Sequence, residues 1–162
     1  MIKLEATACI DAPAAVVWEA LARIEDIKLW SEAVRDSRCE GELSRGVGAE
    51  RTCDLAGGIT ITERWLAWDD GRSFTYEGVG LPMIKRARNT WTVKPEGERT
   101  LLVSNAEVVL KGGRIGRLLE PLFRLQFARM GPRTLAAFRH LVEEGESPRM
   151  RHSKLPLPAT TC

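Results

Sequence analysis

The sequence has few of the residues from which metal centres and nucleophilic triads are built. It holds four cysteines and two histidines in 162 residues, and no two cysteines have the C-x-x-C spacing of a metal or redox site. His140 and His152 belong to no motif that activates a serine. We therefore expect a protein that uses neither a metal nor a cofactor.

The four cysteines do not suggest a disulfide framework. Cys9, Cys39 and Cys53 fall in predicted strands, and Cys162 ends a segment without apolar periodicity. In a cytoplasmic protein such cysteines are reduced, and buried ones pack as small apolar side chains. We expect this state for the first three and an exposed thiol at Cys162.

The chain also lacks a strong charge of either sign and a long apolar run. Its 24 basic and 22 acidic residues leave a formal net charge of +2, which argues against nucleic acid as a partner. No stretch is long and apolar enough for a membrane span, and Lys3 and Glu5 interrupt any signal-peptide core. We expect a cytoplasmic protein without stable membrane insertion; its oligomeric state, monomer or homodimer, stays open.

What the sequence does have is a sharp change of pattern between residues 9 and 30. An alternating apolar strand stops at Asp11, and an amphipathic helix follows at once with Pro13 in its first turn. We expect Asp11 to cap this helix, which spans 13–22, and a second short helix at about 24–31.

From residue 34 onward the apolar period is two. Asp-Asp-Gly at 69–71 and Pro-Glu-Gly at 95–97 are typical hairpin turns, and such short loops join antiparallel neighbours. With a first strand at 2–10, the pattern predicts seven strands, the others at about 34–42, 47–55, 58–68, 72–79, 84–94 and 100–110.

A long amphipathic helix follows Gly112 and Gly113. Pro121 is expected to open a fresh helical segment, and Pro132 to kink the helix. The polar face is typical of a solvated surface and also suits an anionic partner or a membrane; its arginines are Arg114, Arg117, Arg124, Arg129, Arg133 and Arg139.

The last seventeen residues have no periodic apolar stripe. They contain Pro148, Pro156 and Pro158, and the composition predicts a disordered tail at 146–162. The remainder, 1–145, is then one domain, which the length also favours.

This order of strand, two small helices, six strands and one long helix resembles the START-like or SRPBCC superfamily, in its bacterial polyketide cyclase/dehydrase-type form. The resemblance covers about residues 2–144. The residues that carry it are Ile10-Asp11-Ala12-Pro13 with Val17-Trp18 and Leu21, then Trp30, Glu63-Arg64-Trp65, Trp68-Asp69-Asp70-Gly71, Tyr76-Glu77, Trp91 before Pro95-Glu96-Gly97, and Leu141-Val142-Glu143-Glu144.

The resemblance implies an α+β helix-grip fold, in which a seven-stranded antiparallel sheet wraps around the long helix and leaves an apolar cavity between them. Strand alternation independently indicates which side chains share one face. The last strand is ambiguous, because both of its faces are apolar. We assign to the interior Ile59, Ile61, Glu63 and Trp65, then Phe74, Tyr76 and Gly78, then Ala87, Asn89, Trp91 and Val93.

Glu63 is the best catalytic candidate, together with Tyr76. A carboxylate among Ile61, Trp65 and Tyr76 is desolvated, which favours its neutral form and suits a general acid or base. Two structural alternatives stay open. A bulge would turn Glu63 outward to pair with an arginine, and an inward Glu63 can simply hydrogen-bond Tyr76 or a bound water.

The ligand-binding candidates combine these polar residues with aromatic side chains and the middle of the long helix. Each aromatic also suits plain core packing. We predict that Trp65, Tyr76, Trp91, Phe123, Phe127 and Met130 line one cavity of about 300 Å³ or more. The full candidate set is Trp30, Glu63, Trp65, Tyr76, Asn89, Trp91, Phe123, Phe127 and Met130.

Three functions remain. The first is a protein that binds a hydrophobic lipid-, aromatic- or polyketide-like small molecule. The second, by resemblance to polyketide aromatase/cyclases, is a cofactor-independent cyclase or dehydratase. The third is an interaction protein that uses the arginine-rich helix face.

Overall fold

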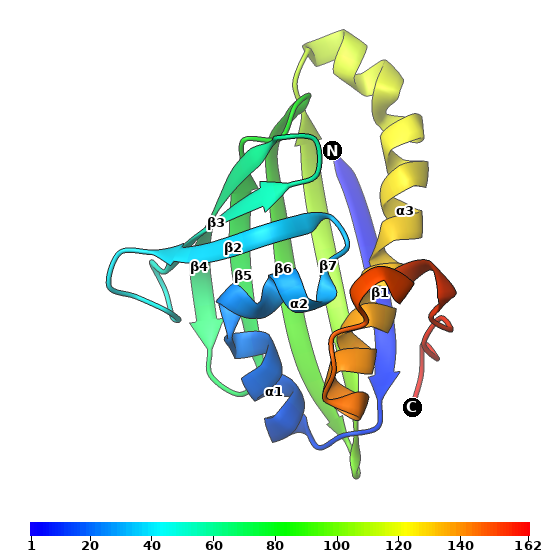
Figure 1. Cartoon of the computed structure of the whole chain (residues 1–162). Helices are drawn as coiled ribbons and strands as arrows, with labels where there is room; N and C mark the ends of the chain where they lie inside the picture. Colours follow the sequence, from blue (N-terminus) through cyan, green and yellow to red (C-terminus); the bar gives the residue numbers. More distant parts are fainter.

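Seven antiparallel strands form one curved sheet in the computed structural model, which describes the backbone of residues 1–162 and all side chains except those of 149–151 (Figure 1). The strand order is β1-β7-β6-β5-β4-β3-β2. Consecutive hairpins run from β2 to β7, and β1 pairs with β7. The strands are β1 (Ile2–Ile10), β2 (Val34–Glu40), β3 (Glu50–Leu55), β4 (Thr60–Asp69), β5 (Ser73–Val79), β6 (Ile84–Glu96) and β7 (Arg99–Leu110).

The helices complete the predicted helix-grip fold. Two short ones lie between β1 and β2, and the long helix after β7 packs on the sheet, mainly beside β1 (Figure 1). Its C-terminal half buries Leu135, Ala137 and Phe138 in the core. The helical segments are α1 (Ala14–Ala22), the 3-10 turn η1 (Ile24–Asp26), α2 (Ile27–Trp30), α3 (Gly113–Glu144) and the 3-10 turn η2 (Arg149–Lys154).

The start of α1 corrects one prediction. Pro13 occupies the N-cap position and no side chain caps the helix, so Asp11 is not the cap. The backbone N–H of Asp11 instead donates a hydrogen bond to Glu143 Oε1 at 2.8 Å, near the end of α3. This contact ties the β1–α1 connection to the C-terminal end of the long helix.

Helix α3 continues through both of its prolines. The prediction that Pro121 opens a separate segment is wrong, although the first turns of α3 point in a different direction from the rest (Figure 1). Near Pro132 the helix comes so close to β1 that a Cβ added to Gly131 would lie 3.1 Å from Cβ of Ala6. Glycine at this position allows the close approach.

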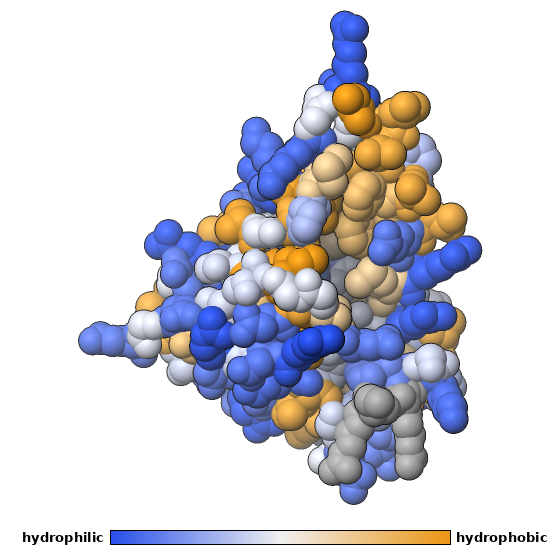
Figure 2. Space-filling view, turned by 45° about the horizontal axis from the view of Figure 1, so that its top comes forward, coloured by the Kyte–Doolittle hydropathy of each residue, from blue (hydrophilic) through white to orange (hydrophobic). Residues whose placement is uncertain are grey.

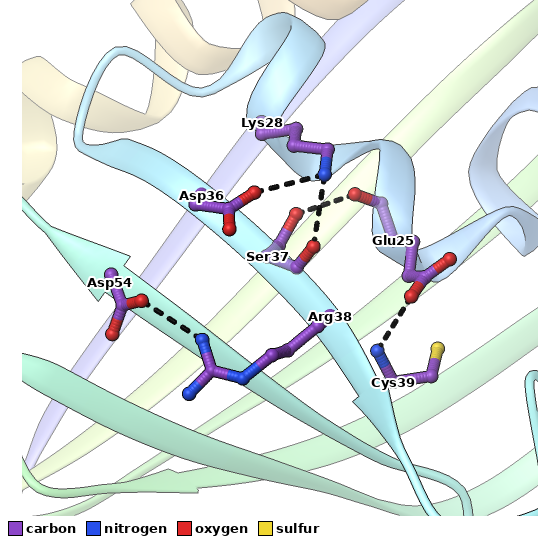
Figure 3. Close-up of polar contacts among 7 residues, drawn as sticks. All are labelled: Glu25, Lys28, Asp36, Ser37, Arg38, Cys39 and Asp54. Atoms are coloured by element: carbon purple, nitrogen blue, oxygen red, sulfur yellow. Dashed lines mark hydrogen bonds and ion pairs between the residues drawn. The ribbon is translucent and has the colours of Figure 1, made fainter.

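Polar contacts hold η1 and α2 against β2 (Figure 3). Glu25 accepts hydrogen bonds at both its backbone carbonyl, from the Ser37 hydroxyl, and its carboxylate, from the Cys39 backbone N–H at 2.8 Å. Lys28 Nζ lies 2.9 Å from Asp36 Oδ1. These bonds fix the turn whose Ile24 carbonyl takes part in the site described below.

The core falls into two clusters. The larger is formed by α1, η1, α2, the C-terminal half of α3 and all seven strands. The smaller contains Ile2, Ile84 and Val108, with Phe123 and Phe127 of α3 packed against it. A space that neither cluster fills lies between them.

A disulfide joins Cys9 of β1 to Cys162, with their Cα atoms 5.1 Å apart. The prediction of reduced thiols at these two positions is therefore wrong, whereas Cys39 and Cys53 are free. The pairing arises because the chain returns along β1: the Cys9 N–H donates to the Ala159 carbonyl at 2.7 Å, and the Thr7 hydroxyl donates to the Thr160 carbonyl at 3.0 Å.

The tail thus has defined contacts at its end, and η2 lies within it. Its predicted disorder concerns motion and stays a prediction. The cytoplasmic location also stays a prediction. The Cys9–Cys162 disulfide does not support it, because disulfides persist mainly in oxidising compartments. Among the described residues, no helix has the length and apolar content needed to cross a bilayer.

Candidate functional site

A cavity of about 270 Å³ lies between the inner face of the sheet and the middle of α3. It is somewhat smaller than the sequence predicts. Its walls come from β1, β4–β7, the β5–β6 loop and α3, and most of the side chains are apolar. The lining residues include Leu4, Ala6, Ile61, Glu63, Tyr76, Gly78, Leu81, Ala87, Asn89, Trp91, Ser104, Ala106, Val108, Phe127, Met130, Gly131 and Thr134.

Small residues create this space. Facing strands carry Ala6, Gly78, Ala87 and Ala106 where larger side chains would meet α3, and the helix itself carries Gly131. A Cβ on Gly78 would touch Glu63 Cγ at 3.4 Å. The cavity therefore follows directly from the sequence of the lining, since bulkier residues at these positions would fill it.

Glu63 forms a buried ion pair that the sequence analysis did not predict. Alternation in β4 turns Glu63 inward as predicted, and Arg51 of β3 lies directly opposite it in the antiparallel register. Arg51 Nε donates to Glu63 Oε2 at 2.8 Å, Nη2 donates to the same oxygen, and Nη1 donates to the Ile24 carbonyl. Both side chains are more than nine-tenths buried.

This pairing gives Glu63 a charged neighbour that the sequence analysis did not include. The sequence predicts a carboxyl among apolar neighbours, which favours the neutral acid, but the Arg51 guanidinium supplies a counter-charge and two hydrogen bonds. The signal was present in the alternation of β3: the Gly57–Gly58 hairpin fixes the register, and counting back from it places Arg51 opposite Glu63.

Tyr76 lies beside this ion pair. The Arg51 guanidinium is 5.7 Å from the centre of the Tyr76 ring and 5.0 Å from that of Trp65. Burial and then the charge of Glu63 raise the pKa of Tyr76 to about 12, and the charge of Arg51, followed by hydrogen bonding from Trp91 and Asn89, offsets part of this effect. The phenol is thus protonated at neutral pH and able to donate a hydrogen bond.

Asn89 and Ser104 extend the polar wall of the cavity. The Ser104 hydroxyl donates to Asn89 Oδ1 at 3.1 Å across the β6–β7 pair. Ser104 was not among the predicted site residues, because the inner face of the last strand was ambiguous. The structure resolves that ambiguity, since Ser104, Ala106 and Val108 all line the cavity.

Cys53 adds a thiol behind the carboxylate. It is fully buried, and its Sγ donates to Glu63 Oε2 at 3.6 Å. Burial is the main cause that raises the pKa of this thiol to about 12. A buried thiol of this kind is inert as a nucleophile.

The structure brings together six of the nine predicted ligand-binding residues. They line the cavity and are Glu63, Tyr76, Asn89, Trp91, Phe127 and Met130. Of the six side chains predicted to share one cavity, Tyr76, Trp91, Phe127 and Met130 do so. The remaining three candidates, Trp30, Trp65 and Phe123, do not line the cavity and lie behind the residues that do.

Each of these three aromatic residues supports the cavity from behind. The ring of Trp30 packs 5.8 Å from Trp91 and 5.1 Å from Phe138. Trp65 is fully buried, with its ring 5.0 Å from Tyr76. Phe123 packs on Phe127 at 5.9 Å within the smaller core cluster.

Comparison with solved structures places this fold among known ones. An aromatase/cyclase from Streptomyces sp. R1128, Zhui, is 22% identical, with a TM-score of 0.68 over 96% of this chain and 99% of that one. A protein from Thermus thermophilus is 21% identical, with a TM-score of 0.71 over 89% and 99%. Norcoclaurine synthase from Thalictrum flavum is 17% identical, with a TM-score of 0.67 over 88% and 94%.

At these identities the structural likeness concerns the fold alone. No curated protein is significantly similar to the chain. A family model described as polyketide cyclase/dehydrase and lipid transport matches residues 1–143, nearly the whole domain, and agrees with the resemblance seen in the sequence. The chain therefore belongs to the polyketide cyclase/dehydrase and lipid transport family of the SRPBCC superfamily.

Proposed function

We propose that the protein binds a hydrophobic small molecule, of lipid-, aromatic- or polyketide-like character, in the cavity between the sheet and α3. The observation that carries this proposal is the cavity itself, whose walls are mainly apolar and most of whose polar residues lie on β4–β7. Proteins bind small ligands in hollows of this composition. With this function we propose a cytoplasmic location.

The volume favours a compact ligand. Pockets for drug-sized molecules span roughly 300–1,000 Å³, and this cavity measures about 270 Å³. Two or three fused rings or a short acyl chain suit that space better than a lipid with two long chains. The aromatic walls at Tyr76, Trp91 and Phe127 further favour a flat ligand.

The polar wall favours a ligand with a carbonyl or hydroxyl group. Tyr76 offers a protonated phenol, and Asn89 and Ser104 offer an amide and a hydroxyl already joined to each other. A ligand oxygen placed there gains hydrogen bonds that an all-carbon analogue lacks. The family description, which names polyketide chemistry and lipid transport together, supports the same ligand classes.

Isothermal titration calorimetry with 2-naphthol, a two-ring phenol, tests the proposal. We expect saturable binding to one site in the wild type. Ala87→Phe fills the cavity and should abolish binding, whereas Ala67→Phe makes the same change on an exposed position of β4 and should leave binding intact. Unchanged affinity in a folded Ala87→Phe protein would show that the ligand binds elsewhere.

A cofactor-independent cyclase or dehydratase is the second candidate function. The observation that favours it is the protonated Tyr76 beside Glu63, because a phenol can polarise a ligand carbonyl. Tyr76 is now the better catalytic candidate, since Arg51 occupies one oxygen of Glu63. Incubation with a linear poly-β-ketone thioester, followed by mass spectrometry, should show loss of water that Tyr76→Phe abolishes; no turnover in the wild type would exclude this activity for that substrate class.

A further inference from the structure

The first half of α3 has an apolar face on each side. The inner face places Phe123 and Phe127 against the sheet. The outer face carries a second stripe at three- and four-residue spacing, Ile115, Leu118, Leu122 and Leu125, whose side chains are 67%, 80%, 64% and 53% exposed. A surface helix needs only one apolar face, and exposed apolar stripes of this kind are typical of interaction surfaces.

The neighbouring loop enlarges the apolar surface. Met83, in the β5–β6 connection, accepts a hydrogen bond at its carbonyl from the Lys111 N–H at 2.7 Å, which fixes that loop beside the start of α3. Met83 and Val79 are both exposed. Figure 2, in which the top of Figure 1 comes forward, shows apolar side chains gathered over this end of the molecule.

The same region concentrates positive charge. Between Lys111 and Arg133 there are six basic residues and one acidic residue, although the whole chain has a formal net charge of only +2. That one acid, Glu120, pairs with the N-terminal ammonium of Met1 at 2.6 Å. Among the described side chains no acid pairs with the basic residues of the segment, which are Lys111, Arg114, Arg117, Arg124, Arg129 and Arg133, and all six are exposed.

We propose that the first half of α3, through the stripe Ile115, Leu118, Leu122 and Leu125 and its flanking arginines, docks the protein on the surface of an anionic lipid bilayer. Exposed aliphatic side chains enter the boundary between headgroups and acyl chains, while basic side chains beside them meet the lipid phosphates. The helix is too charged to span the bilayer, so the contact is peripheral and reversible.

A second copy of the chain fits the surface less well. In a symmetric dimer the same patch faces itself, and the unpaired Arg114, Arg117 and Arg124 of the two copies would approach one another. An anionic bilayer instead supplies opposite charge to all of them. It also requires no complementary shape, which suits a stripe that protrudes from a convex helix.

The docking surface lies next to the cavity. Phe127 and Met130, about one turn beyond Leu125, line the cavity on the opposite side of the same helix. Docking would therefore hold the cavity close to the membrane. The inference rests on the exposed face of α3 alone and does not depend on the ligand-binding proposal.

Co-sedimentation with lipid vesicles tests the inference. The full chain should sediment with vesicles of phosphatidylcholine and phosphatidylglycerol in equal amounts, should remain in solution with phosphatidylcholine alone, and should dissociate as salt rises. The double variants Leu118→Ser/Leu122→Ser and Arg117→Gln/Arg124→Gln should each bind the anionic vesicles roughly tenfold more weakly.

A matched control removes apolar side chains elsewhere. Leu43 and Val47 are 50% and 60% exposed in the β2–β3 connection, so Leu43→Ser/Val47→Ser should bind vesicles like the wild type. All these positions are exposed, and urea unfolding of the Leu118→Ser/Leu122→Ser protein verifies that the variant is folded.

Two outcomes would overturn the inference. In the first, the wild type does not bind anionic vesicles, or the Leu118→Ser/Leu122→Ser variant binds them as well as the wild type. In the second, sedimentation velocity shows a wild-type dimer that this variant converts to a monomer, which would assign the stripe to a contact between copies of the chain.

Discussion

At the scale of single residues, burial decides how strongly each partner of the Arg51–Glu63 ion pair depends on the other. Two neighbouring cross-strand pairs on β3 and β4 show this by contrast. Arg51 faces Glu63 inside the domain, whereas Glu50 faces Arg64 on the outer surface at 3.5 Å. The two pairs have the same residue types in the same sheet and differ in burial.

Arg51→Met should lower the free energy of unfolding by about 3–5 kcal/mol, because it leaves the buried Glu63 carboxylate without a counter-charge. Arg64→Met on the outer face should cost less than about 1 kcal/mol. Urea unfolding followed by fluorescence measures both. In Arg51→Met/Glu63→Leu most of the loss should be recovered; a double variant as unstable as Arg51→Met would contradict this explanation.

Tyr76 can be titrated alone because it is the only tyrosine. Its phenolate absorbance should appear with a midpoint near pH 12 in the folded protein, against 10.0 for an ordinary tyrosine. Between these values only the folded state keeps the proton, so Tyr76 makes stability fall as the pH rises from 10 towards 12. Tyr76→Phe should remove this part of the fall, and a midpoint near 10 in the folded wild type would show that the ring is solvated.

At the scale of elements, most of the fold could be predicted because its signals are local. Short turns such as Asp69-Asp70-Gly71 fix both the ends of strands and their register, and alternation then assigns the inner faces of β4, β5 and β6. The amphipathic period of α3 likewise identifies a long helix that covers the sheet.

Features that depend on contacts between distant segments were not predictable in this way. Packing depth decides which aromatic rings line the cavity and which lie behind them. Trp65 and Tyr76 point to the same face of the sheet, yet only Tyr76 lines the cavity. The disulfide was missed for the same reason, because Cys9 and Cys162 are 153 residues apart.

The tail gives a prediction at this scale. Cys162→Ser should unfold at a lower denaturant concentration than the oxidised wild type, because a disulfide restricts the unfolded chain; the chain-entropy view gives on the order of 5 kcal/mol for so long a loop. Added reductant should lower the wild type to the level of Cys162→Ser and leave the variant unchanged. Equal stability of the two proteins without reductant would mean that the bond does not form or contributes nothing.

At the scale of the whole molecule, packing and surface character are divided between the two ends of α3. The C-terminal half of the helix completes the larger core cluster, whereas the N-terminal half belongs to the smaller cluster and exposes the apolar stripe. The cavity lies between these regions. Substitutions in the first half of α3 should therefore weaken vesicle binding more than they lower the free energy of unfolding. Substitutions at Leu135 or Phe138 should do the reverse.

The disulfide also turns the polypeptide into a covalent ring that includes all but its first eight residues. A protease site inserted between Gly57 and Gly58, in an exposed turn with open space around both residues, would open that ring at a second place. Cleavage there should leave one molecule on a non-reducing gel and two fragments on a reducing gel. New backbone ends could then be placed at any exposed turn, because one cut in the ring leaves every segment of the sheet and α3 covalently connected.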